Sequence, residues 1–156
     1  MNEVVLVAYR QRVNALFARS SVFDADPELL SHWAKYICVL VSGYLETALK
    51  HYFCEFSRNK SHPYICSFTM ANLEDFMNPK MEKILQLTGA FSKDWKKELE
   101  AFVEGERKDA VDSIVANRNN IAHGRNVSLT LVRMKKYFEK ALEVTEFIKR
   151  KVEVEL

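Results

Sequence analysis

The sequence predicts an all-α fold, a helical bundle with two long helices and several shorter ones. Apolar residues recur at spacings of three and four along most of the chain, as they do on the buried face of a helix. No segment shows the sustained alternation of apolar and polar residues that is typical of a strand. Only four Gly and three Pro interrupt the 156 residues. We expect residues 1–156 to form a single domain, because a chain of this length can bury one core.

Composition excludes several classes of protein. Apolar residues make up 48% and charged residues 28%, which is ordinary for a globular domain. The 23 Lys and Arg nearly balance the 21 Asp and Glu, leaving a net charge of +2. The chain as a whole therefore does not attract polyanions strongly, and any nucleic-acid site must be a local patch.

The sequence also favours a cytoplasmic location. The longest apolar run, 36–42, is too short to cross a membrane. The first residues include Glu3 and lack the cationic segment of a signal peptide. Three irregularly spaced cysteines indicate free thiols in a reducing compartment.

The first half of the chain predicts two helices. The first ends near Ser20 and is followed by a loop over 21–25. Asp26 and Pro27 form the expected start of the second helix, an N-cap residue followed by proline at the first helical position. Apolar residues then keep helical spacing for about eight turns, and the helix should end in the polar run 57–63.

The second half predicts shorter helices and one more long helix. Gly105 separates a middle group from a helix that starts near Glu106. The final helix starts near Ser128 and runs to about Val152. The middle group comprises 69–76, capped by Thr69; 79–87, opened by Asn78-Pro79; and about 95–103, capped by Ser92.

The segment 117–125, NRNNIAHGR, contains two arginines, three asparagines and a histidine. Arg118 and His123 lie five positions apart, so on an undistorted helix their side chains differ in direction by about 140°. They could meet if the helix ends between them, or if each meets its counterpart across a symmetric dimer. Gly124 favours a helix end, because glycine is the usual residue beyond a C-terminus.

An arginine and a histidine in one cleft suit the cleavage of RNA. Histidine titrates near neutral pH and can take a proton from a 2′-hydroxyl or give one to a leaving oxygen. Arginine stays cationic and binds phosphate through its planar fork. Asn119 and Asn120 could orient these groups. The reaction needs neither a metal nor another cofactor when the 2′-oxygen is the nucleophile.

The same residues are also compatible with a simple helix ending. Cationic side chains in a last turn interact favourably with the helix dipole and the free carbonyls. Asn and Gly are common in turns. By spacing alone this is the commoner explanation, since a signature of two residues often occurs by chance.

The amino-acid sequence of the motif also resembles that of a known family. RNNIAHG at 118–124 is similar to the signature of HEPN domains, which is an Arg, a polar residue, a few further residues and a His. Here these are Arg118, Asn119, the segment 120–122 and His123. The segment VSGYLETALKHYF at 41–53 also resembles the second helix of the RiboL-PSP-type HEPN group.

This resemblance implies a helical bundle that dimerises and brings two motifs into one cleft. It further implies a metal-independent endoribonuclease of a toxin–antitoxin or phage-defence system, acting on RNA and controlled by an antitoxin or another protein. Arg118 and His123 would be catalytic, with Asn119 and Asn120 in support. Glu46 matches an acid found on the long helix of related domains and could orient either catalytic residue, although a solvated or structural carboxylate is the commoner role for a Glu on a helix. The alternative is a non-catalytic module of the same fold that binds a nucleotide or a protein.

Cations beyond the motif could extend a phosphate-binding surface. Arg125 lies closest and is the expected substrate contact, and Arg133, Lys135 and Lys136 follow at the start of the last helix. A solvated basic helix face is the alternative explanation for them.

Two further groups of residues invite other interpretations. His51, Cys54, His62 and Cys66 could ligate zinc, but their spacing matches no common zinc pattern, and we expect no metal. Aromatic residues on the long helix could stack on bases, although their helical spacing favours the core or a dimer interface. These aromatic residues are Trp33, Tyr36, Tyr44, Tyr52, Phe53 and Phe56.

Overall fold

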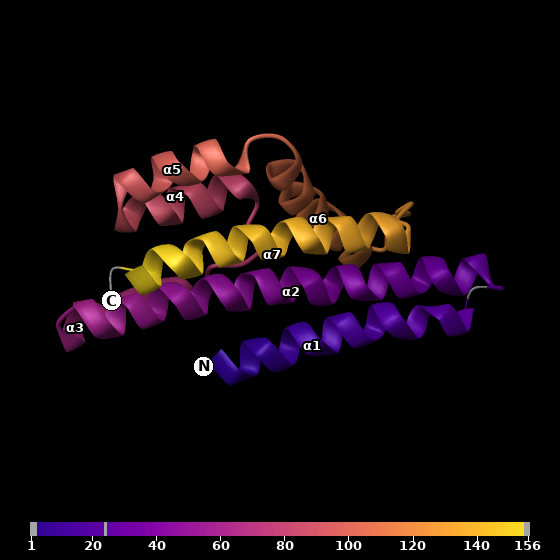
Figure 1. The fold of residues 1–156 in the computed structure, drawn as a ribbon, viewed down its shortest axis with the longest axis horizontal. Helices are drawn as coiled ribbons and strands as arrows, with labels where there is room; N and C mark the ends of the chain where they lie inside the picture. The colour runs from indigo at the N-terminus through magenta and orange to yellow at the C-terminus, as the bar shows by residue number, and fades with distance from the viewer. Residues whose placement is uncertain (1–2, 24, 155–156) are drawn as a thin grey trace.

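The computed structural model describes residues 3–23 and 25–154 (Figure 1). Every regular element in these ranges is helical, which confirms the predicted all-α class. The elements in chain order are α1 (Glu3–Arg19), the 3-10 helix η1 (Ser20–Phe23), α2 (Pro27–Lys60), α3 (Pro63–Glu74), α4 (Met81–Phe91), α5 (Lys93–Val103), α6 (Glu106–Ala122) and α7 (Leu131–Val154).

The long helix α2 begins where the sequence predicts. Asp26 Oδ1 accepts hydrogen bonds from the backbone N–H groups of Glu28 and Leu29, at 3.0 and 3.1 Å. These bonds satisfy two of the donors that a helix leaves free at its start. The helix extends into the polar run and ends at Lys60, because Pro63 prevents it from continuing far beyond.

The prediction for α3 was wrong at its start. Thr69 does not cap this helix but lies inside it, where its Oγ1 donates to the carbonyl oxygen of Ile65 at 2.9 Å. The helix begins at Pro63, which occupies the first helical position and needs no hydrogen-bond acceptor there. His62 Nδ1 accepts from the N–H of Tyr64 at 3.4 Å and is the cap.

Two other helices begin later than predicted. Asn78 has a φ of +51°, a left-handed conformation that cannot continue into a helix, so α4 begins at Met81 rather than at Pro79. In α7, Thr130 Oγ1 accepts from the N–H of Arg133 at 3.2 Å. Thr130 thus caps α7, which begins at Leu131 rather than near Ser128.

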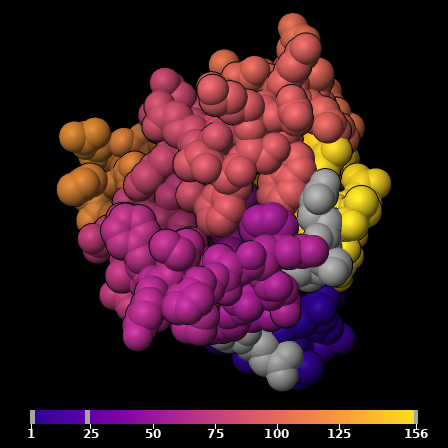
Figure 2. Space-filling view, turned by 90° about the vertical axis from the view of Figure 1, so that its left-hand side faces the viewer, coloured from indigo at the N-terminus to yellow at the C-terminus, as the bar shows by residue number. Residues whose placement is uncertain are grey.

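The helices α2 and α7 run side by side along the molecule, with α1 beside α2 (Figure 1). Helix α6 packs on both α2 and α7, while α4 and α5 form a hairpin at one end. Figure 2 shows this end, where α3 in magenta lies next to the α4–α5 hairpin.

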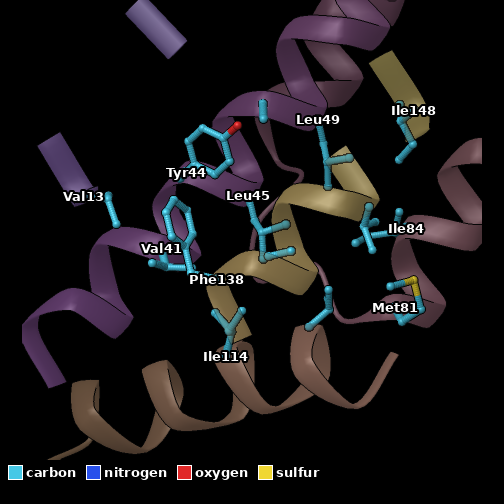
Figure 3. Close-up of a cluster of buried hydrophobic side chains, with 14 of the residues drawn as sticks. Val13, Val41, Tyr44, Leu45, Leu49, Met81, Ile84, Ile114, Phe138 and Ile148 are labelled. Carbon is cyan, nitrogen blue, oxygen red and sulfur yellow. The ribbon is translucent and has the colours of Figure 1, made fainter. Parts of the chain in front are cut away.

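The core lies where α2 meets the other helices. Figure 3 shows Tyr44 and Leu45 of α2 beside Phe138 of α7, with Ile114 of α6 and Met81 of α4 completing the cluster. The rings of Tyr44 and Phe138 lie 5.9 Å apart in an edge-to-face arrangement. This packing fixes two helices against the long helix: α6, which carries most of the motif, and α7, which follows it.

Most aromatic residues of α2 belong to this core, as their spacing predicts. Tyr44, Tyr52 and Phe53 are buried. Trp33 is half-buried, as is Phe56. The exception is Tyr36, whose side chain is 43% exposed.

The three cysteines Cys38, Cys54 and Cys66 are free thiols, as expected. Burial raises the pKa of Cys38 to about 12, so its thiol stays neutral. Its Sγ donates to the carbonyl oxygen of Ile114 at 3.5 Å, which joins α2 to α6. In the part of the chain that the structure describes, no helix is both long enough and apolar enough to span a membrane.

Candidate active site

Helix α6 carries the motif and is anchored along one side. It begins after Gly105, whose φ of +83° suits glycine. Val111 and Ile114 are fully buried against the core. Arg118 follows Ile114 by four positions, so it lies on the same side of the helix and is half-buried. The core therefore fixes the helix turn from which Arg118 projects.

The motif ends in the turn that Gly124 predicts. Gly124 has a φ of +66°, and its N–H donates to the carbonyl oxygen of Ile121 at 3.1 Å. The N–H of Arg125 donates to the carbonyl oxygen of Asn120 at 2.9 Å. These two bonds are the pair that defines a Schellman helix end. His123 is the C-cap residue and lies in this turn with Gly124, and it is exposed.

Side chains reinforce this ending. Arg125 Nη1 donates to Asn120 Oδ1 at 3.3 Å. The same two residues share the backbone bond that spans more of the chain. An apolar contact often links these two positions in Schellman motifs. A polar contact here leaves the cationic head of Arg125 at the surface beside His123.

Helix geometry directs Arg118 and His123 to different sides of α6. The helix ends after Ala122, so both residues keep directions close to those of an undistorted helix, about 140° apart. Arg118 Nη1 donates to Asn119 Oδ1 at 3.3 Å. Among the described residues, no hydrogen bond joins Arg118 to His123. The helix end therefore adds no hydrogen bond between these two side chains.

Glu46 has a different partner from the one expected. Its Oε1 accepts from the N–H of Asn78 at 2.8 Å, which holds the left-handed turn before α4. Asp112 of α6 acts similarly, since its Oδ1 accepts from the N–H of Met81 at 2.7 Å. The two carboxylates therefore fix the entry to α4, and the hydrogen bond of Glu46 is not to Arg118 or His123.

The motif opens the cationic stretch considered from the sequence as an extended phosphate-binding surface. From Arg118 to Lys136 the chain contains five Arg or Lys residues and no Asp or Glu. Arg125, Arg133 and Lys135 are exposed, as is Lys136. A phosphate-binding site in a chain of low net charge requires a local positive patch, and these residues are the candidates for it.

The residues considered for zinc are not assembled into a metal site. Across residues 3–23 and 25–154, no group of three or more His, Cys, Asp or Glu side chains is placed to hold a metal ion. His62 caps α3, and His51 is buried with its ring 5.5 Å from that of Tyr52. The Sγ of Cys66 lies 3.8 Å from the Sδ of Met70.

Comparison with protein families matches residues 8–154 to RiboL-PSP-HEPN. Comparisons with curated proteins and with solved structures find no match. The matched range includes all of α2 and the whole NRNNIAHGR segment. It therefore covers both segments on which the sequence resemblance depends, and the chain belongs to the RiboL-PSP-HEPN family.

Proposed function

We propose that this protein is a metal-independent endoribonuclease of the HEPN type. The observation that carries the proposal is the end of α6, which presents an exposed His123 and a half-buried Arg118 within a cationic stretch free of carboxylates. The family match supports this assignment, because the motif lies inside the matched range.

The chemistry follows from the properties of the two side chains. His123 takes the proton of the RNA 2′-hydroxyl, and the freed oxygen attacks the adjacent phosphorus. The bond from phosphorus to the 5′-oxygen breaks, and that oxygen receives a proton. The products are a 2′,3′-cyclic phosphate and a 5′-hydroxyl. Arg118 donates hydrogen bonds to the phosphoryl oxygens, which carry increasing negative charge in the transition state.

The supporting residues act through these two. Asn119 Oδ1 accepts from one nitrogen of the Arg118 guanidinium, which leaves its other donors available to phosphate. Asn120 and Arg125 hold the turn next to His123. Arg125 also offers an exposed cation to a neighbouring phosphate of the strand.

Two copies of the chain complete the site in this proposal. One protomer points Arg118 and His123 in different directions, and a reaction that both removes and delivers a proton needs an acid as well as a base. A symmetric dimer places two motifs at one cleft. His123 of the partner subunit then protonates the leaving 5′-oxygen.

The biological setting follows from the family resemblance alone. We propose a toxin or phage-defence effector that is held in check by an antitoxin or another protein. Cleavage of cellular or phage RNA would be its effect.

The test measures cleavage of a single-stranded RNA in the presence of EDTA. Removal of a general acid–base group should slow cleavage by about 10²–10⁴-fold, so we expect a loss of this size for His123→Ala. Arg118→Ala should also cleave much more slowly, because one charge-stabilising interaction is lost. Matched controls are His62→Ala and Arg150→Ala, which remove an exposed histidine and an exposed arginine elsewhere.

Equal rates for the wild type and both motif variants would exclude the proposed mechanism. RNA that is bound but left uncut by the wild type would instead favour the non-catalytic module. Loss of activity in the two control variants as well would show that the motif has no special role.

A further inference from the structure

A second cationic feature lies away from the motif. It is a cleft of about 740 Å³ between α1 and the N-terminal half of α2. The lining residues that matter for a ligand are Arg12, Arg19, Leu29, His32, Trp33 and Tyr36. Two arginines, a histidine and two aromatic rings therefore share one surface depression.

The aromatic residues of the cleft are held in place by hydrogen bonds. Trp33 Nε1 donates to the carbonyl oxygen of Leu16 at 2.8 Å, which ties the indole ring to α1. Arg12 Nη2 donates to the hydroxyl oxygen of Tyr36 at 3.5 Å. The two rings lie 5.9 Å apart and are tilted by 49°, so they do not cover each other. The Tyr36 ring, 43% exposed, stays available for stacking.

The charge of the cleft favours an anionic ligand. Among its described lining residues there are two arginines, Arg12 and Arg19, and no carboxylate. One acid, Glu28, pairs with a lining residue: its Oε1 lies 3.9 Å from His32 Nε2 in a solvent-exposed pair of little strength. Exposed Arg beside an exposed ring is the combination that binds single strands, with phosphates on the cations and bases on the ring.

The first turns of α2 connect this cleft with the region of the motif. On one side, Leu29 and His32 line the cleft. On the other, Leu30 and Ser31 line a shallow depression of about 380 Å³ together with the segment 128–132, which follows the motif turn. Figure 1 shows the ends of α1 and α6 and the start of α2 toward the same end of the molecule.

We propose that the cleft between α1 and α2 binds single-stranded RNA, with a base stacked on Tyr36 and a neighbouring phosphate held by Arg12 and Arg19. It acts as an accessory site that retains the strand beside the cleavage site. This inference rests on the proposed function insofar as the bound strand is the substrate.

Binding is measured by fluorescence anisotropy of a labelled single-stranded RNA in the His123→Ala background, in which the strand stays intact. Tyr36→Ala should weaken binding about tenfold, because one stacked base is lost. Tyr36→Phe keeps the ring and should bind like its parent. Arg19→Ala should reduce the slope of log K against log salt concentration by about 0.7, the value for one phosphate contact with a single strand.

Matched controls lie at the other end of the bundle. Tyr64 on α3 is 80% exposed and Arg150 on α7 is exposed, so Tyr64→Ala and Arg150→Ala remove the same groups elsewhere. Both should leave affinity and salt slope unchanged. Unchanged binding in Tyr36→Ala and Arg19→Ala would overturn the inference, as would equal losses in the controls. A change in oligomer mass in Tyr36→Ala without loss of RNA affinity would show that the cleft contacts protein instead.

The two proposals fail in different ways. If the wild type does not cleave RNA but the cleft variants still lose affinity, the nuclease assignment falls and the binding site stands. If the wild type cleaves and the cleft variants bind RNA like their parent, the nuclease stands and the binding site falls.

Discussion

Asn120 and Arg125 are bonded twice, once through their backbones at 2.9 Å and once through their side chains at 3.3 Å. Both bonds close the turn that contains His123 and Gly124. The pair therefore ties the position of His123 to α6, although neither residue needs to touch the reacting atoms.

This relationship predicts that the two side chains act as one unit. Asn120→Ala and Arg125→Ala should each lower the free energy of unfolding by about 0.5 kcal/mol, a modest value because the bond is exposed. The double variant should lose little more than either single variant. Urea unfolding of the four proteins measures the coupling. Fully additive losses would show that the side-chain bond contributes nothing.

The turn also predicts a specific role for Gly124. Apart from its two chain neighbours, no described residue has an atom within 4 Å of the position that a Cβ at Gly124 would take, so a side chain would fit without a clash. The left-handed backbone alone should make Gly124→Ala less stable by about 1–2 kcal/mol. Gly124→Asn should lose less, because asparagine tolerates this conformation better. Thermal unfolding compares the two, and equal losses for both substitutions would contradict this explanation.

Glu46 offers a test that separates structure from catalysis. Glu46→Gln keeps an oxygen that can accept from the N–H of Asn78, whereas Glu46→Ala leaves that partly buried donor without its bond. We expect a loss of about 1–3 kcal/mol in unfolding free energy for Ala and a smaller loss for Gln. Glu46→Gln should also cleave RNA at nearly the wild-type rate. A large loss of activity in Glu46→Gln at unchanged stability would restore the role expected from the family.

The local features of the sequence predicted the fold well. The start of α2 and the end of α6 could be found from residue type alone, because the residues that set them act on their immediate neighbours. Asp26 and Pro27 set the start of α2, and Gly124 sets the end of α6. The error at α3 arose because two cap signals compete, and the proline at 63 prevails over Thr69.

Contacts between distant segments could not be predicted in the same way. Glu46 and Asn78 are 32 positions apart, and Met81 and Asp112 are 31 apart. Their pairing depends on how α2, α4 and α6 pack, which no local pattern specifies. The cleft between α1 and α2 was missed for the same reason, because its cations and rings come from two helices.

The contact between α6 and α7 predicts a pH dependence of stability. Burial raises the pKa of the Glu143 carboxyl, but hydrogen bonds from Lys140 Nζ at 3.0 Å and Arg107 Nε at 2.6 Å outweigh this effect. The pKa of Glu143 is therefore lowered from its ordinary value of 4.5. A carboxyl with a lower pKa in the folded state stabilises the protein above the unfolded value, and this stability is lost as pH falls through the folded pKa.

We accordingly expect Glu143→Gln to lose less stability than the wild type between about pH 6 and pH 3. The matched control is Glu139→Gln, one turn earlier on α7, at an exposed position. Urea unfolding across this pH range gives the two slopes. The same acid-induced loss of stability in Glu143→Gln and in the wild type would show that Glu143 does not contribute to the pH dependence.

The most direct test of the central claim compares an RNA strand with its fully 2′-deoxy counterpart as substrates in EDTA. If His123 activates the 2′-hydroxyl, the wild type cuts only the RNA, leaving a 2′,3′-cyclic phosphate and a 5′-hydroxyl, and His123→Ala slows this by about 10²–10⁴-fold. Cleavage of the deoxy strand at a comparable rate would contradict the claim, because that strand lacks the proposed nucleophile.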